Sequence, residues 1–300
     1  MLPDRLVLFL NRGAANLGNA AKAVPPTGLV LLSISSTQLG AAIAKSLFNE
    51  LGSAGTVLLR VGFAAIVLLL LWRPRLRGYT IANYFVVILF GLVLAGMNLC
   101  FYYAIERIPL GIAVTIEFLG PLAVAIAGSR RLLDLLWVLL AASGIVLLAP
   151  LGGRLDPLGV VLALLAGSLW GAYILLSARV GRAFSGGTGL AIAMAVATVV
   201  LLPVGVLSGG AALLNPQLLT MGFGVALLSS ALPYSLELEA LRRLKTGVFG
   251  VLMSLEPAIA AAAGFVILDE KLEVRAITAI LLVSVAAAGA SRFRARGSID

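Results

Sequence analysis

Long apolar runs fill almost the whole chain, and short breaks containing charged residues, Gly or Pro separate them. An α-helix needs about 20 predominantly apolar residues to cross the hydrocarbon core of a bilayer. The pattern predicts ten spanning helices, over residues 27–47, 54–72, 80–103, 110–129, 132–149, 157–178, 188–207, 217–241, 246–268 and 273–290. We therefore expect an all-α integral membrane protein whose loops leave no room for an extramembrane domain.

Composition changes the picture mainly by what it excludes. Hydrophobic residues make up 61% of the 300 positions and charged residues 12%, against about 25% charged in ordinary globular domains, so a water-soluble enzyme is nearly excluded. The chain has no His and one Cys, Cys100. It therefore lacks the commonest metal ligand and any internal disulfide, and we expect no metal, no cofactor and no thiol chemistry.

The net charge of +9 comes from basic residues near the ends of the predicted spans. With the N-terminus inside, the cytoplasmic segments carry 16 Lys and Arg and the opposite side carries four. Basic residues concentrate on the cytoplasmic side of membrane proteins. The asymmetry predicts cytoplasmic tails at residues 1–26 and 291–300 and an even number of spans, with lipid around the protein and no nucleic-acid partner.

The two halves of the chain look related. A shift of 136 positions aligns Pro121 with Pro257 and Asp134 with Glu270. Each half, residues 27–149 and residues 157–290, holds five predicted spans. Because five is odd, the second half enters the membrane from the opposite side, which makes an inverted repeat of the kind that secondary transporters use for alternating access. A duplication kept only for packing is the alternative.

Charged residues inside the predicted spans are site candidates, because a charge is costly in the bilayer interior. Glu117 lies in the fourth span and Glu256 in the ninth. Lys45 and Arg60 lie near the outer ends of the first two spans and Glu237 near the inner end of the eighth, where each could instead reach the interface. A carboxylate among apolar helices can exchange between charged and neutral forms, which favours coupling to protons.

Three prolines should interrupt predicted spans, since proline lacks the N–H that bonds the carbonyl four residues back. Pro233 leaves the carbonyl of Ser229 without that bond, and Pro257 acts similarly in the ninth span. For Pro121 the carbonyl belongs to Glu117, so a carboxylate and a carbonyl without its helical partner could together bind a primary ammonium. An ordinary kink repaired by neighbouring helices is the alternative for each proline.

Polar side chains recur at helical spacing on several predicted spans. They are Gln38, Lys45, Asn98, Tyr102, Trp170, Tyr173 and Glu237. Such faces could line a pathway for a small polar solute, or they could be seams at which helices pack closely. In the first case we expect Lys45 with Gln38 to bind a substrate carboxylate and Glu117 to bind its ammonium.

Six motifs together resemble the threonine and homoserine exporter branch of the drug/metabolite transporter superfamily, which is built from EamA-type repeats. They are AAIAKSLF at 41–48, PLGIAV at 109–114, EF and GPLAVA within 117–125, SRR at 129–131, ALPYSLE at 231–237 and MSLEPA at 253–258. The resemblance covers about residues 28–290. It implies a bacterial inner-membrane protein of ten helices that exports small amino acids by exchange with protons.

The leading interpretation is a secondary exporter of threonine- or homoserine-like amino acids, and not an enzyme. A carrier of the same superfamily for another metabolite or a drug is the first alternative. A channel would show no countertransport. An intramembrane enzyme would need a nucleophile with its base, and without His the candidates reduce to isolated Ser residues and Lys45.

Overall fold

The computed structural model of the chain describes residues 24–74, 78–127, 132–148, 155–185, 187–241, 243–244 and 246–294. Within these ranges every regular element is helical. The predicted tails, the SRR motif and the basic residues at 75–77, 130–131 and 154 lie wholly or mostly outside them. The cytoplasmic placement of both termini therefore stays a prediction.

The helices follow the apolar runs along the chain. In order they are α2 (Pro26–Ser46), α3 (Phe48–Trp72), α4 (Ile81–Arg107), α5 (Leu110–Glu117), α6 (Leu119–Ala127), α7 (Leu132–Leu148), α8 (Pro157–Ala183), α9 (Thr188–Gly209), η1 (Gly210–Leu214), α10 (Pro216–Ala226), η2 (Leu227–Ala231), α11 (Leu232–Leu241), α12 (Thr246–Met253), α13 (Glu256–Leu268) and α14 (Val274–Arg294). Side-chain caps begin α4, α8 and α10, where Thr80, Asp156 and Asn215 each accept a backbone N–H of the first turn.

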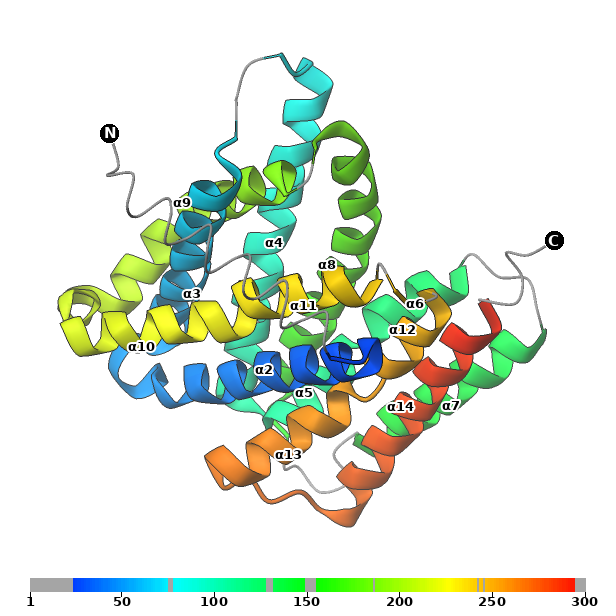
Figure 1. Cartoon of the computed structure of the whole chain (residues 1–300). Helices are drawn as coiled ribbons and strands as arrows, with labels where there is room; N and C mark the ends of the chain where they lie inside the picture. The colour runs from blue at the N-terminus through cyan, green and yellow to red at the C-terminus, as the bar shows by residue number, and fades with distance from the viewer. Residues whose placement is uncertain are drawn as a thin grey trace.

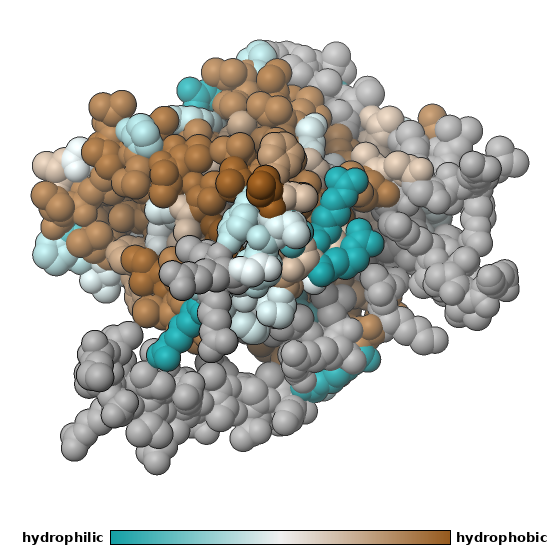
Figure 2. Space-filling model, turned by 90° about the horizontal axis from the view of Figure 1, so that it is seen from above, coloured by the Kyte–Doolittle hydropathy of each residue, from teal (hydrophilic) through white to brown (hydrophobic). Residues whose placement is uncertain are grey.

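Five of the described helices are long and apolar enough to cross a membrane. They cover Pro26–Ser46, Phe48–Trp72, Ile81–Arg107, Pro157–Ala183 and Thr188–Leu214, and shorter apolar helices cover Leu110–Val124, Pro216–Ala231, Glu256–Leu268 and Val274–Gly289. Their outer faces carry large exposed hydrophobic side chains such as Ile81, Leu207 and Val266. Hydrophobic residues cover most of the coloured surface in Figure 2. A surface so apolar suits lipid and not water.

Three predicted spans are divided near their prolines. The span that contains Pro121 is split between α5 and α6 at Phe118, and the span that contains Pro257 is split between α12 and α13 at residues 254–255. In the span that contains Pro233, the π-helical turn η2 lies between α10 and α11.

The first two of these breaks are related by the same shift as the sequence. Both α5 and α12 are eight residues long, and each end of α12 lies 136 positions after the matching end of α5. The helix packing follows a similar pattern. The pairs α3 with α9 and α7 with α14 each join corresponding helices of the two halves. Two further contacts between the halves also correspond to each other: α4 packs on α8, and α2 packs on η2 and α11 (Figure 1).

Candidate functional site

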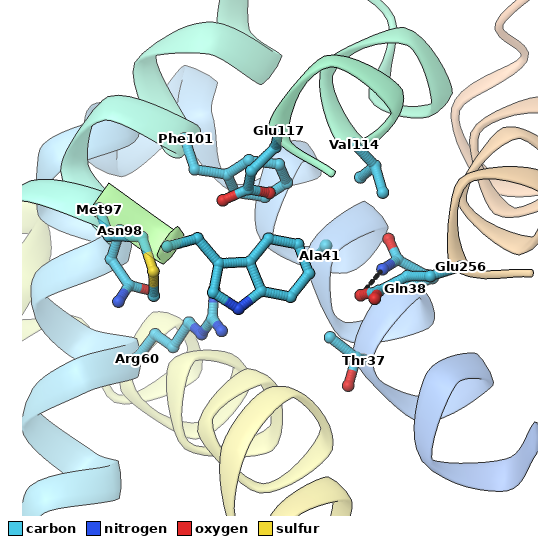
Figure 3. Close-up of a pocket in the computed structure, with 11 residues that line it drawn as sticks. Thr37, Gln38, Ala41, Arg60, Met97, Asn98, Phe101, Val114, Glu117 and Glu256 are labelled. Atoms are coloured by element: carbon cyan, nitrogen blue, oxygen red, sulfur yellow. Dashed lines mark hydrogen bonds between the residues drawn. The ribbon is translucent and has the colours of Figure 1, made fainter. Parts of the chain in front are cut away.

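A small cavity lies between helices of both halves. Its volume is about 110 Å³, and residues of α2, α3, α4, α5, α8 and α13 surround it (Figure 3). The lining residues are Thr37, Gln38, Ala41, Arg60, Met97, Asn98, Phe101, Val114, Glu117, Trp170 and Glu256. Two acidic residues, one basic residue and two side-chain amides thus meet within an apolar helix bundle.

The two acidic residues lie at the two helix breaks. Glu117 is the last residue of α5 and Glu256 is the first residue of α13, and both are buried. The backbone of Glu117 packs so closely on α8 that a Cβ added to Gly167 would lie 2.5 Å from its carbonyl oxygen. The breaks therefore place two carboxylates from distant parts of the sequence at one cavity.

Gln38 and Glu256 form a pair whose hydrogen bonds are incomplete. The Nε2 of Gln38 donates to Oε1 of Glu256 at 2.9 Å. Among the described residues, neither Oε1 of Gln38 nor Oε2 of Glu256 has a hydrogen-bond partner, although both atoms are buried. A buried acceptor without a partner costs free energy, so the pair is suited to receive an N–H or O–H donor from an occupant of the cavity.

The basic group of the cavity is Arg60 on α3. Its Nη1 donates to the hydroxyl of Tyr102 at 3.3 Å, and its Nη2 donates to the carbonyl of Ser229 at 3.4 Å. That carbonyl is the one that Pro233 cannot bond within a regular helix. Glu117 interacts electrostatically with both Glu256 and Arg60. The cavity thus presents charges of both signs to a small solute.

Arg60 lines the cavity, whereas the sequence analysis left open that it reaches the interface instead. The second span was predicted from residue 54, which put Arg60 near a span end. α3 is kinked at Gly52, whose φ of +67° and ψ of 165° are not helical, so the regular helix that carries Arg60 starts directly after Gly52, close to the predicted start. The sequence did contain a signal for Arg60, since a charged residue inside a predicted span is a candidate site residue.

Two further predicted residues line the cavity. Asn98 is buried on α4 and its Nδ2 donates to the carbonyl of Leu94 at 2.9 Å. Trp170 on α8 packs edge-on against Phe118, with ring centres 5.6 Å apart. The neighbouring wall residues, Thr37, Ala41, Met97, Phe101 and Val114, were not predicted. Most are apolar and resemble ordinary core residues in the sequence.

Lys45 lies outside the cavity lining. Its Nζ donates to Oε1 of Glu270 at 2.6 Å and to the carbonyl of Ile108 at 3.3 Å. The other carboxylate oxygen of Glu270 accepts the backbone N–H of Leu110 at 2.8 Å. The structure therefore does not bring Lys45 together with Gln38, and it pairs this cation with a carboxylate that the sequence analysis did not select as a partner.

The remaining predicted residues also lie outside the lining. Tyr102 is fully buried behind Arg60. Tyr173 stacks on Phe90, with ring centres 5.1 Å apart. Glu237 on α11 accepts a hydrogen bond from the hydroxyl of Ser33 at 2.7 Å.

Comparisons with known proteins agree with this architecture. Residues 157–292 match the model of the EamA-like transporter family. The threonine/homoserine exporter RhtA of Salmonella typhimurium strain LT2 is 42% identical over 266 residues, covering 87% of this chain and 90% of the exporter. RhtA of Escherichia coli strain K12 is 41% identical over the same length and coverage. A solved crystal structure, 18% identical, superposes with a TM-score of 0.59 over 91% of this chain and 99% of that chain. At that identity the likeness shows the fold alone.

Proposed function

The chain belongs to the EamA-like transporter family, on the threonine/homoserine exporter branch of the drug/metabolite transporter superfamily, and from this membership we propose that it exports small amino acids of the threonine and homoserine type. It is a bacterial membrane transporter and not an enzyme. We place it in the inner membrane, where it moves its substrate out of the cytoplasm by alternating access.

The observation that carries this proposal is the charge pattern of the cavity. Arg60 contributes a positive group, and Glu117 and Glu256 contribute negative groups. An α-amino acid carries one charge of each sign, so its two ends match this arrangement. The cavity of about 110 Å³ is also small beside the roughly 300–1,000 Å³ of pockets for drug-sized ligands, which favours a small metabolite over a drug.

We further propose that the chain spans the membrane ten times, as two inverted repeats over residues 27–149 and 157–290 with both termini in the cytoplasm. Two observations support this arrangement: the 136-residue spacing between α5 and α12, and the helix pairs that join the halves. In such a repeat, exchange of conformation between the halves opens the central cavity first to one side and then to the other.

Protons are the proposed coupling ion, and Glu117 is the proposed coupling residue. Its buried carboxylate lines the cavity, and no hydrogen bond from the described residues reaches its side-chain oxygens. When the cavity faces the cytoplasm, Glu117 releases a proton and binds the substrate ammonium. When the cavity faces outward, a proton replaces the substrate, so that the return step carries a neutral carboxyl group.

Export of labelled threonine or homoserine from loaded cells tests the proposal. Cells that express the chain should lose label faster than empty-vector cells, and a protonophore should abolish the difference. Glu117→Gln should reduce efflux to the empty-vector level at equal protein abundance. Glu50→Gln, the same substitution at an exposed position of α3, is the matched control and should export normally.

The outcomes separate the parts of the proposal. Efflux from wild-type cells no faster than from empty-vector cells would show that the substrate assignment is wrong. Normal efflux from Glu117→Gln cells would instead exclude Glu117 as the coupling residue. Export that persists unchanged without a proton gradient would exclude proton coupling.

A further inference from the structure

The guanidinium of Arg60 is held in a fixed direction at the cavity wall. Tyr102 holds it in two ways, because its hydroxyl accepts from Nη1 and its ring centre lies 5.5 Å from Cζ. The carbonyl of Ser229 accepts from Nη2. Both partners are uncharged, so these two contacts orient the guanidinium by hydrogen bonding and by its position over the ring.

The Ser229 contact depends on local helix geometry. The α-helical partner of this carbonyl would be the N–H of residue 233, which is a proline. Ser229 also lies within the π-helical turn η2, between α10 and α11. Turns of this kind are frequent at functional sites. Here the irregular backbone supplies an acceptor that reaches across to α3 and positions a side chain.

The acidic groups approach the cavity from other helices. In Figure 3, Arg60 extends toward the middle of the cluster from α3, while Glu117 and the Gln38–Glu256 pair extend from other sides. The incomplete hydrogen bonds of Gln38 and Glu256 offer two acceptors and no positive charge. A substrate carboxylate therefore has one cationic group to meet in the cavity lining, and a substrate ammonium has four acidic or amide side chains.

We propose that Arg60 binds the carboxylate of the exported amino acid, and that this contact makes the site selective for α-amino acids over the corresponding amines. The inference rests on the proposed function and adds a specificity-determining residue to it. The planar guanidinium matches a carboxylate with two parallel hydrogen bonds, which an ammonium from Lys cannot reproduce. Lys45, the cation expected for this role from the sequence, is instead paired with Glu270.

Competition in proteoliposomes tests the role of Arg60. Uptake of labelled threonine by the purified full chain is measured with two competitors: unlabelled threonine and 1-aminopropan-2-ol, which is threonine without its carboxylate. For wild type, half-maximal inhibition should require a concentration of the amine about 10- to 100-fold higher than that of unlabelled threonine, because the amine lacks the charge-assisted contact of the carboxylate. Arg60→Gln should raise the KM for threonine by a similar factor and leave inhibition by the amine unchanged, so that the discrimination is lost.

Three further variants keep the test decisive. Arg60→Lys retains a point charge and should recover part of the discrimination. Tyr102→Phe keeps the arginine and removes one of its orienting contacts, so it should raise the KM only a fewfold. Arg107→Gln removes an exposed arginine of α4 and should match wild type. If Arg60→Gln does not accumulate, a reduced discrimination in Arg60→Lys carries the test.

Two results would contradict different claims. Equal discrimination between threonine and the amine in wild type and in both Arg60 variants would overturn the role of Arg60, even if the variants lower kcat or stability as a purely structural arginine would. Wild-type protein that takes up no labelled amino acid would instead contradict the proposed function.

Discussion

Two charged clusters of this protein differ in how completely their groups are paired. At the C-terminal end of α2, Lys45 contacts Glu270 at 2.6 Å, and the second carboxylate oxygen accepts the N–H of Leu110. In the cavity, Glu256 has one bonded oxygen and one buried oxygen without a partner among the described residues. The first cluster is closed on itself, and the second is open to an occupant.

From this difference we expect the Lys45–Glu270 cluster to serve stability and the cavity cluster to serve transport. Buried polar groups are nearly always hydrogen-bonded in folded proteins, so an incomplete set is a cost that folding alone does not explain. The Lys45–Glu270 pair needs no ligand to complete it. The Gln38–Glu256 pair does, and it lies beside Arg60 and Glu117. Substitutions in the Lys45–Glu270 cluster should therefore lower stability and leave export intact, whereas substitutions in the cavity cluster should lower export and leave stability intact.

Among substitutions within these two pairs and around them, and after the loss expected for Glu117→Gln, the largest effect should come from Glu256→Gln. Export should fall about 10- to 100-fold, because a charged hydrogen bond to the substrate is lost. The thermal midpoint in detergent should stay the same or rise, since the new amide can still bond Gln38 and the buried carboxylate oxygen of Glu256 without a partner is removed. Labelled efflux and a heated size-exclusion assay measure the two quantities. A lower midpoint with normal export would mean that the cavity cluster is structural.

Gly167→Ala should follow, because it disturbs the backbone that carries Glu117. A Cβ at this position meets the Glu117 carbonyl, and overpacking of this kind costs about 1–3 kcal/mol. Both stability and export should fall. Gly181→Ala on the same helix is the control, since a Cβ there meets no atom within 4 Å, and it should stabilise the helix by up to about 1 kcal/mol. Equal stability and equal export of the two variants would show that close packing at Gly167 does not position Glu117.

Glu270→Gln should lower stability by about 1–2 kcal/mol and leave export per folded molecule close to wild type. The side chains of Lys45 and Glu270 are 21% and 13% exposed, so the pair lies between exposed pairs and fully buried ones in its contribution. The exchange Lys45→Glu with Glu270→Lys should restore stability only partly, because the N–H of Leu110 then loses its acceptor. Thermal midpoints compare the stability of the variants. Lost export at normal stability would show that this cluster belongs to the transport site.

The smallest effect should come from Arg107→Gln, which removes an exposed ion pair with Glu106 at 3.2 Å and a longer one with Asp156 at 3.6 Å. Such pairs contribute at most about 1 kcal/mol and are screened by salt. Thermal midpoints at low and high salt should differ little from wild type. A larger drop in thermal midpoint than that of Glu270→Gln would show that the exposure of these ion pairs does not predict their contribution to stability.

The apolar pattern predicted the helices well because membrane spans must be long and apolar. The run at 27–47 corresponds to α2, Pro26–Ser46, and the prolines marked the spans that are divided. Helix ends were less predictable. α3 is kinked at Gly52, whose φ is +67°, two positions before the predicted start of the second span at residue 54. The helical turn that begins at Phe48, before the kink, was not predicted.

A position inside a predicted span indicated several of the polar and aromatic residues that line the cavity. Gln38, Asn98, Glu117, Trp170 and Glu256 line the cavity, as polar and aromatic residues inside spans often do. Lys45 was assigned to the pathway by its spacing from Gln38. Spacing along one helix does not reveal a partner 225 positions away in the sequence, and the contact with Glu270 decides what this lysine does.

Two side-chain hydrogen bonds join the helix α2 to α13 or the segment directly after it, Gln38 with Glu256 and Lys45 with Glu270. The two α2 residues are seven positions apart on one unbroken helix, a rise of about 10.5 Å. Two anchors at that separation resist both sliding and rotation of one helix against the other. A transport cycle must therefore move this stretch of the two helices as a single rigid brace, or else break the amide contact at the cavity before the ion pair at its far end.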